Sequence, residues 1–259
     1  MKPKKHLGQH FLTAPSYAKK ISEAVPAERD DRVLEIGPGQ GALTVFLRER
    51  FTRLHLIEID ETAIAVLLKK LGTGSYSLHK GDVLGIDFGT IGFPLHVTGN
   101  LPYSIGALII KKTLLYGNDI KSCTFMVQRE VAQRIVAETH TRTYGFLSVF
   151  CSFFGTPRLL FHVPPGSFFP PPKIYSSVFR IIVDDDLCGK LPRERWNSFF
   201  ALVSRGFQQR RKKVINALAT DTWPKERLTE VMKTVGVDTT SRAEDLSCTQ
   251  WLEVYKNLW

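Results

Sequence analysis

Residues 33–41, VLEIGPGQG, decide the fold class of this chain. A short apolar run that ends in a glycine-rich turn is typical of a buried strand leading into a helix. Gly37 and Gly39 allow a tight turn and let the backbone approach a ligand closely. The spacing is GxGxG rather than GxGxxG, and Pro38 removes one backbone amide, which disfavours a dinucleotide. The stretch therefore predicts the ligand loop of an α/β protein.

Strands and helices alternate on the C-terminal side of this loop. Further strands are expected at 54–59, 76–79, 95–99 and 123–128, with helices at about 41–50, 61–71, 105–116 and 129–138. Alternation at this spacing predicts βαβ units and a mostly parallel, doubly wound sheet.

The pattern changes after Gly145. The segments 146–154 (FLSVFCSFF) and 173–183 (KIYSSVFRIIV) are rich in strand-forming residues and flank a proline-rich loop at 163–172. We expect them to form an antiparallel pair at the edge of the sheet.

A boundary is expected at the acidic run 184–186. From about residue 192 to the C-terminus the pattern is helical, with turn signals near Trp223 and Gly236. We therefore expect residues 1–186 to form an α/β domain with a basic N-terminal arm, and residues 187–259 to form a small helical domain.

The charge of the chain is concentrated at its two ends. The 259 residues include 35 Lys and Arg against 25 Asp and Glu, a net charge of +10. Residues 1–20 hold five lysines and no acid, residues 186–259 hold 13 basic and 9 acidic side chains, and residues 21–185 hold 17 and 16. This balance disfavours a binder of cationic ligands and favours a polyanionic partner. We interpret the basic residues at the two ends as a contact surface for nucleic acid. The alternative is that this charge serves only general solubility.

Cysteine use and hydropathy limit the other classes. The four cysteines are widely spaced and form no CxxC pair, which predicts reduced thiols and neither a metal site nor a disulfide framework. The N-terminus lacks the apolar core of a signal peptide. The longest apolar stretch, 146–154, is too short to span a membrane. We expect a cytoplasmic protein with no metal and no membrane partner.

Polar residues follow consecutive predicted strands at the edge where open α/β sheets bind ligands. Glu58 ends the second strand and is placed to accept hydrogen bonds from ribose hydroxyls. Asp82 follows the third strand, where its carboxylate can accept from an adenine amino group. Asn100 follows the fourth. Each residue alone is explained as a loop or cap residue, but with Gly37 the four in order favour a binding site.

Asn100-Leu101-Pro102-Tyr103 is the most specific motif. An exocyclic amine is a poor nucleophile because its lone pair is delocalised into the base. A site that methylates it must accept hydrogen bonds from the NH₂ group, and the Asn100 side-chain oxygen and a backbone carbonyl near Leu101 can do so. A carboxylate would add an uncompensated charge. Pro102 stiffens the turn and Tyr103 offers a ring for stacking, although turn chemistry alone would also select Asn and Pro.

Two further features suggest contact with RNA. Phe168 lies in the proline-rich loop, where it is expected to cover the face of an extracted base opposite Tyr103; a phenylalanine that fills a core edge is the alternative. Arg210, Arg211, Lys212 and Lys213 are expected to spread over most of a helix surface and to contact phosphates. A solvated helix face is the alternative there.

Together these motifs resemble the KsgA-like family of ribosomal RNA adenine dimethyltransferases. The motifs that carry the resemblance are LGQHFL (7–12), EIGPGQGALT (35–44), IEID (57–60), GDVL (81–84), NLPY (100–103), VPPGSFFPPPKIYSSV (163–178), FQQRRKKVINAL (207–218) and RAEDLS (242–247). The resemblance implies a Rossmann-like class I methyltransferase fold, S-adenosylmethionine as methyl donor, and two adjacent adenosines in the 3′-terminal hairpin of small-subunit rRNA as substrate. It also implies a role in assembly of the small ribosomal subunit, and we expect a monomer.

The resemblance also implies roles for individual residues. The residues expected to line the cofactor site are His10, Leu12, Gly37, Gly39, Glu58, Asp82, Val83 and Asn100. Asn100 to Tyr103 would form the catalytic motif, with Phe168 on the target base. Lys4 and Lys5 belong to the short basic arm that would contact RNA with residues 210–213. The family usually has asparagine where this chain has His10.

Three alternatives remain open at the level of sequence. An Erm-type enzyme that methylates large-subunit rRNA would share the cofactor loop and the NLPY motif. A non-catalytic ribosome-assembly or nucleic-acid-binding factor could retain the fold, although the intact motif at 100–103 disfavours it. A DNA adenine methyltransferase is disfavoured because no separate sequence-reading domain is evident.

Overall fold

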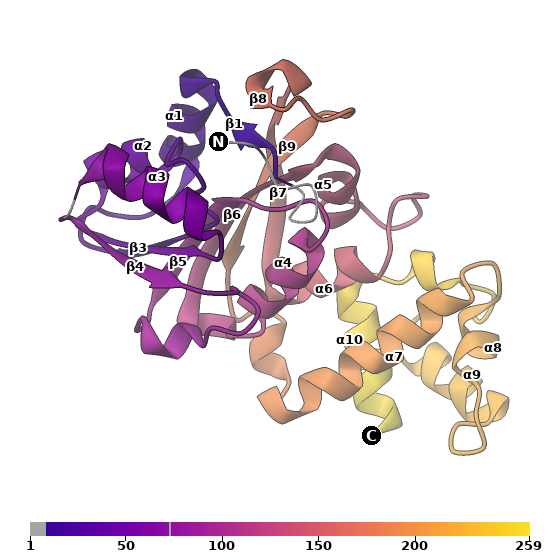
Figure 1. Ribbon diagram of the computed structural model, residues 1–259. Coiled ribbons are helices and arrows are strands. Elements are labelled where there is room, and N and C mark those ends of the chain that lie inside the picture. Colours follow the sequence, from indigo (N-terminus) through magenta and orange to yellow (C-terminus); the bar gives the residue numbers. More distant parts are fainter. Residues whose placement is uncertain (1–8, 73) are drawn as a thin grey trace. The chain divides into compact units, whose positions relative to one another are not determined.

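The computed structural model describes residues 9–72 and 74–259 (Figure 1). The predicted RNA contacts of Lys4 and Lys5 lie outside the described residues. The chain divides into two compact units. The first, here the sheet unit, contains the described residues up to 132 together with 157–183, and the second, the helical unit, contains 133–156 and 184–259.

The described residues of the sheet unit form a seven-stranded sheet in the order β4-β3-β2-β5-β6-β9-β7. The strands are β2 (Arg32–Ile36), β3 (Arg53–Glu58), β4 (Tyr76–Lys80), β5 (Leu95–Asn100), β6 (Ile120–Gln128), β7 (Gly155–Val163) and β9 (Ser176–Val183). From β4 to β6 all neighbours are parallel, and β9 pairs antiparallel with β6. The predicted doubly wound sheet with an antiparallel edge is confirmed.

Four helices follow parallel strands as the alternation predicts. They are α2 (Thr44–Arg50), α3 (Glu61–Leu71), α4 (Gly106–Leu114) and α5 (Arg129–Ile135), and a further helix, α1 (Pro15–Ala24), precedes β2. Helix α3 begins where the Asp60 side chain accepts a hydrogen bond from the Thr62 amide, and it buries Ile64 and Leu67. Leu67 belongs to the apolar cluster that also contains residues of α1, α2 and the strands, and Figure 1 shows α1, α2 and α3 on one face of the sheet.

A second, very small sheet joins two distant segments. Strand β1 (Phe11–Leu12) pairs antiparallel with β8 (Phe168–Phe169), with Phe11 opposite Phe169 and Leu12 opposite Phe168. The Thr13 amide also donates to the Ser167 carbonyl, at 2.8 Å. The N-terminal segment is thereby fastened to the proline-rich loop.

The helical unit contains α6 (Phe146–Phe154), α7 (Trp196–Gln208), α8 (Val214–Leu218), α9 (Lys225–Thr234) and α10 (Cys248–Leu258). Short 3₁₀ turns in the two units are Phe88–Thr90, Gly117–Asp119, Pro165–Ser167, Cys188–Lys190, Arg193–Arg195 and Ala243–Asp245. The predicted strand at 146–154 is wrong, because this segment is helix α6. It lies between Gly145 and Gly155 and is buried on most sides, and its aromatic rings pack on those of α7, such as Phe150 on Phe200. Tertiary packing therefore outweighs the strand preference of these residues.

Candidate active site at the carboxyl ends of the strands

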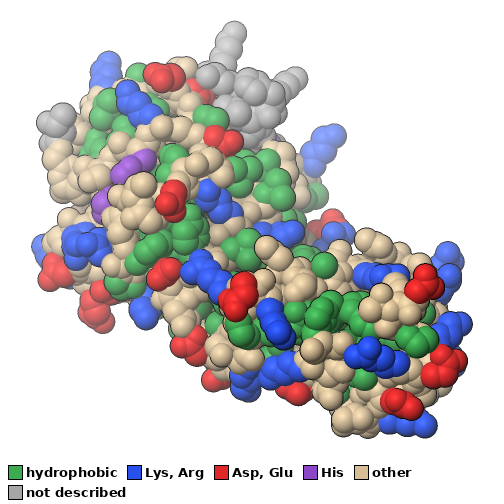
Figure 2. Space-filling view, turned by 90° about the horizontal axis from the view of Figure 1, so that it is seen from below, with side chains coloured by type: hydrophobic (Ala, Val, Ile, Leu, Met, Phe, Trp, Pro, Cys, Tyr) green, Lys and Arg blue, Asp and Glu red, His purple; other side chains and the backbone are tan. Residues whose placement is uncertain are grey.

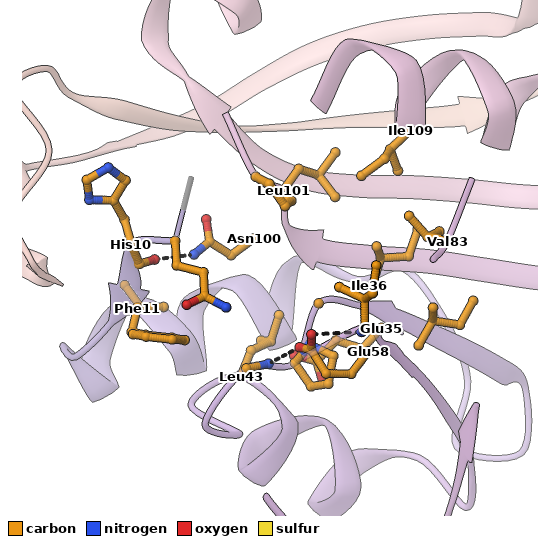
Figure 3. A pocket seen from close by; sticks show the side chains of 18 of the residues that line it. His10, Phe11, Glu35, Ile36, Leu43, Glu58, Val83, Asn100, Leu101 and Ile109 are labelled. Carbon is orange, nitrogen blue, oxygen red and sulfur yellow. Dashed lines mark hydrogen bonds between the residues drawn. The ribbon is translucent and has the colours of Figure 1, made fainter. Parts of the chain in front are cut away.

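A cavity of about 260 Å³ opens at the carboxyl ends of β2, β3 and β5 (Figure 3). All of the predicted cofactor residues line it: His10, Leu12, Gly37, Gly39, Glu58, Asp82, Val83 and Asn100. Leu101, Pro102 and Tyr103 line it as well. Since parallel strands bring their carboxyl ends to one edge, residues from four separate loops meet there.

The glycine loop after β2 requires glycine. Gly37, Gly39 and Gly41 have φ angles of 67°, 55° and 75°, in the left-handed region that other residues rarely adopt. A Cβ on Gly39 would lie 3.1 Å from the Phe11 ring, which closes over the loop. The backbone of the loop is therefore bare where it faces the cavity.

Glu58 is a buried carboxylate that is held by backbone donors. Its Oε2 accepts a hydrogen bond from the Gly39 amide at 3.0 Å, and its Oε1 accepts from the Ile59 and Asp60 amides at 2.9 Å. Only 6% of the residue is exposed. These bonds fix the glycine loop to the end of β3. Because Oε1 already accepts from two amides, Oε2 is the oxygen that keeps lone-pair capacity for a further donor from the cavity.

Glu35 is a second buried carboxyl at the cavity, and the sequence analysis gave it no role of its own. Its Oε2 has no hydrogen-bond partner among the described residues. Burial raises its pKa from the ordinary 4.5 to about 8, an increase that the Thr44 hydroxyl opposes and the charge of Glu58 reinforces. Glu35 is therefore largely protonated at neutral pH.

Asp82 and Val83 form the side of the cavity that follows β4. The Asp82 side chain is exposed, and its Oδ1 accepts from the Leu84 amide at 2.9 Å. Val83 is 7% exposed and adds an apolar wall. This arrangement offers a carboxylate oxygen beside an apolar surface, which suits a flat heterocycle with an amino group.

Asn100 is oriented by a single hydrogen bond that Figure 3 shows as a dashed line. Its Nδ2 donates to the His10 carbonyl oxygen at 3.0 Å. Among the described residues no donor bonds to Asn100 Oδ1, so this oxygen is available in the cavity. The neighbouring Gly99 has to be glycine, because a Cβ there would overlap the Ile36 carbonyl oxygen of β2.

The His10 ring joins three parts of the site. Its Nδ1 lies 2.7 Å from the Pro170 carbonyl oxygen, an acceptor, so Nδ1 carries a proton. The ring stacks on Tyr103 with centroids 5.2 Å apart and planes at 29°. Tyr103 Oη lies 2.6 Å from Ser176 Oγ, and burial raises the pKa of Tyr103. The contact to Asn100 uses the His10 backbone, so it does not depend on which side chain stands there.

Phe168 points away from the position that stacking would require. It is 4% exposed and packs with Leu12 in the apolar cluster of the sheet unit. Its neighbour Phe169 is 57% exposed. Because successive side chains of a strand alternate between faces, β8 can expose only one of the two rings. Stacking by Phe168 remains a prediction that would require β8 to separate from the core.

The basic run at 210–213 lies in a turn rather than on the helix that its sequence suggested. Helix α7 ends at Gln208 and α8 begins at Val214, where the Val214 amide bonds to the Ser241 carbonyl. Arg210 is partly exposed, and its guanidinium donates to the carbonyls of Arg142 and Tyr144 at 3.1 and 2.9 Å and to Glu244 at 2.6 Å. The next three side chains, Arg211, Lys212 and Lys213, are exposed.

The sequence predicted neither a metal site nor a membrane-spanning segment, and the described part of the chain can be compared with both predictions. No group of three or more His, Cys, Asp or Glu side chains in residues 9–72 and 74–259 is arranged to hold a metal ion. Within the same residues, no helix has the length and apolar character needed to cross a bilayer.

Comparisons with known proteins agree with the geometry of the site. The family model for "Ribosomal RNA adenine dimethylase" matches residues 1–259. A protein of Aromatoleum aromaticum named "Ribosomal RNA small subunit methyltransferase A" is 37% identical over 257 residues, 97% of this chain and 92% of the relative. A protein of the same name from Chromobacterium violaceum is 41% identical over 218 residues, covering 83% and 82% of the two chains.

Two solved structures share the fold. A dimethyladenosine transferase from Plasmodium falciparum superposes with a TM-score of 0.80 at 24% identity and covers 95% of this chain and 96% of its own. The 23S rRNA methyltransferase ErmE superposes with a TM-score of 0.75 at 23% identity and covers 96% and 99%. At these identities the likeness shows the fold, and it does not separate the two kinds of substrate.

Proposed function

The chain belongs to the ribosomal RNA adenine dimethylase family, and from this premise we propose that it dimethylates two adjacent adenosines in the 3′-terminal hairpin of small-subunit (16S) rRNA. It is an rRNA adenine dimethyltransferase, and the methyl groups go to the N6 amines of the two bases. The relatives that are named for the small subunit support that substrate. The enzyme would act in the cytoplasm as a monomer and contribute to assembly of the small subunit.

The observation that carries the proposal is the orientation of Asn100. The His10 carbonyl accepts from Asn100 Nδ2, which leaves Oδ1 as an acceptor in the cavity. An amine that is about to be methylated needs acceptors for its N–H groups, because these bonds favour a pyramidal nitrogen with an available lone pair. A side chain fixed in this way accepts without having to reorganise during the reaction.

The residues of the cavity fit S-adenosylmethionine. Buried Glu58 keeps acceptor capacity for ribose hydroxyls, Asp82 offers an oxygen for the adenine amino group, and Val83 offers an apolar surface for the ring. The bare backbone at Gly37 and Gly39 leaves room for close approach. When bound, S-adenosylmethionine supplies an electrophilic methyl group on a positively charged sulfur.

The chain contributes position and hydrogen bonds rather than a covalent intermediate. Asn100 Oδ1 and the Leu101 carbonyl accept from the target amine, while Pro102 holds the turn. Tyr103 stacks against the target base, with its ring fixed by His10 on one side and Ser176 at its hydroxyl. These groups would hold the amine for transfer of the methyl group, in which the N–C bond would form as the S–C bond breaks; S-adenosylhomocysteine would be the leaving group, and the surplus amine proton would pass to solvent. Positioning and electrostatic preorganisation account for the rate.

Contact with the RNA backbone is assigned to the exposed cations of the helical unit. Arg211, Lys212 and Lys213 project into solvent next to one another and can neutralise phosphates. Arg210 stabilises the turn that carries them, because its guanidinium donates hydrogen bonds both to the 142–144 segment and to Glu244. Lys4 and Lys5 would add to this contact from the N-terminal arm.

The test is methyl transfer from labelled S-adenosylmethionine to small ribosomal subunits that lack the modification, with large-subunit RNA as the control. We expect the label in the small-subunit rRNA as N6,N6-dimethyladenosine. Label only in the large-subunit RNA would move the chain to the Erm type. Binding of S-adenosylmethionine without any transfer would indicate a non-catalytic assembly factor.

A further inference from the structure

A short loop beside the cavity exposes an unusual set of side chains. Phe169 is 57% exposed, Ile174 42% and Tyr175 47%, and Lys173 between them is also exposed. We call these four residues the aromatic rim. Large apolar groups that remain in water next to a binding site mark a surface that a partner covers.

The pairing of β1 with β8 places one end of the rim at the cavity. Phe169 lies directly opposite Phe11 in this antiparallel pair, and opposed residues project from the same face. Phe11 lines the cavity and closes over Gly39. In the other opposed pair, Phe168 is buried in the core, and Leu12 packs in the same cluster while it also borders the cavity. The exposed ring of Phe169 is therefore on the cavity face of the strand pair.

The other end of the rim is fastened to the catalytic motif. Tyr175 directly precedes Ser176, whose hydroxyl lies 2.6 Å from Tyr103 Oη, and the Tyr175 carbonyl accepts from the Arg129 amide at 2.9 Å. At the first end, the Pro170 carbonyl bonds to the His10 ring, which stacks on Tyr103. Consecutive prolines stiffen the segment between these anchors. The loop that carries the rings is thus anchored at both ends to residues that contact Tyr103 or its neighbours.

We propose that the aromatic rim binds the nucleotides that flank the target adenosine, with their bases stacked on Phe169 and Tyr175 and a phosphate near Lys173. The inference rests on the proposed function and concerns the substrate of the same site. A target base that is drawn out of its stack leaves neighbours with exposed faces, and aromatic side chains cover such faces with little sequence preference. The two exposed rings and the cation between them offer the pattern that single-stranded RNA requires.

The experiment measures steady-state methyl transfer to small subunits lacking the modification, with the variants Phe169→Ala, Tyr175→Ala and both together. Each single variant should raise the KM for the subunit about 5- to 30-fold, the usual effect of removing one stacking ring. The kcat at saturating subunit and the affinity for S-adenosylmethionine should stay within about twofold of the parent. Phe169→Trp and Tyr175→Phe keep a ring and should restore the parent KM.

The matched control is Ile182→Ala, which removes a side chain of similar exposure (46%) from β9 of the same unit. A double rim variant with the KM of this control would overturn the inference, provided that the parent methylates small subunits. A fall in kcat with an unchanged KM would also overturn it, since that result places the rings on the target base. A parent that methylates no small subunit contradicts the proposed function itself and leaves the rim without its substrate.

Discussion

Glu58 in the sheet unit and Arg211 in the helical unit are both charged, but the protein holds them in opposite ways. Glu58 is 6% exposed and bonds to three backbone amides, and Asn100 in the same cavity is oriented by a backbone carbonyl. Arg211 and the two lysines after it lie exposed in a turn. Chemistry at one atom needs preorganised groups, whereas attraction to a polyanion acts over several ångströms and needs only nearby charge.

The largest expected effect comes from removing the preorganised acceptor. Asn100→Ala should lower the single-turnover rate of methyl transfer about 100- to 1000-fold or more, because the amine loses a fixed hydrogen-bond partner. Binding of S-adenosylmethionine, measured by calorimetry, should change little. Asn257→Ala serves as the control, at an exposed position in α10 whose side chain donates to the Glu253 carbonyl of the same helix. Parent activity in the Asn100 variant would remove this residue from the mechanism.

The next effect concerns the exposed charges. Changing Arg211, Lys212 and Lys213 together to glutamine should weaken RNA binding and reduce the slope of log affinity against log salt by about 2 to 3. The matched control changes three other exposed lysines of the helical unit, Lys190, Lys225 and Lys233. If the two triple variants had the same slope of log affinity against log salt, net charge alone would explain RNA binding, and the turn at 211–213 would not be a specific contact site.

A smaller effect separates Arg210 from the residue that follows it. Arg210→Ala should lower the free energy of unfolding by about 1–2 kcal/mol, because three acceptors lose a donor at a partly exposed site. Arg211→Ala should change it by less than about 0.5 kcal/mol. Urea denaturation of both variants measures the difference. A similar stability for the two would argue against an internal role for Arg210.

A separate prediction concerns Glu35 and the dependence of stability on pH. Its pKa is about 8 in the folded protein against an ordinary 4.5, so the folded state binds more protons within this range. The free energy of unfolding should therefore fall as pH rises from about 4.5 to 8. Glu35→Gln should flatten that slope in urea titrations at several pH values, while Glu23→Gln, at an exposed position on α1, should leave it unchanged. If the free energy of unfolding of the Glu35→Gln variant depended on pH as steeply as that of the parent, the raised pKa of Glu35 would be contradicted.

The sequence was most informative where local pattern and tertiary position agree. Strand–helix alternation predicted the sheet, and the residues after its strands predicted that Gly37, Glu58, Asp82 and Asn100 share one edge, because parallel strands bring their ends together. The sequence was misleading where tertiary packing determines the secondary structure or the burial of a side chain. The aromatic run 146–154 resembles a strand in isolation and becomes α6 because other aromatic rings surround it. Phe168 and Phe169 are chemically identical, and only the pairing with β1 determines which ring is buried.

The same distinction explains the basic run. Four consecutive cations look alike in sequence, but the guanidinium of Arg210 bonds to acceptors of residues 142, 144 and 244, while the three side chains after it are exposed. No local signal could have identified them. Glu35 was visible in the glycine-loop motif, but its raised pKa depends on burial that the motif does not encode.

The most direct test of the division between chemistry and RNA binding is single-turnover methyl transfer measured against the concentration of small subunits. Asn100→Ala should reduce the maximal rate about 100-fold or more and leave the half-saturating concentration near that of the parent. The triple variant at 211–213 should raise the half-saturating concentration and keep the parent maximal rate. A lower maximal rate in the triple variant, or weakened binding as the main defect of Asn100→Ala, would contradict the division.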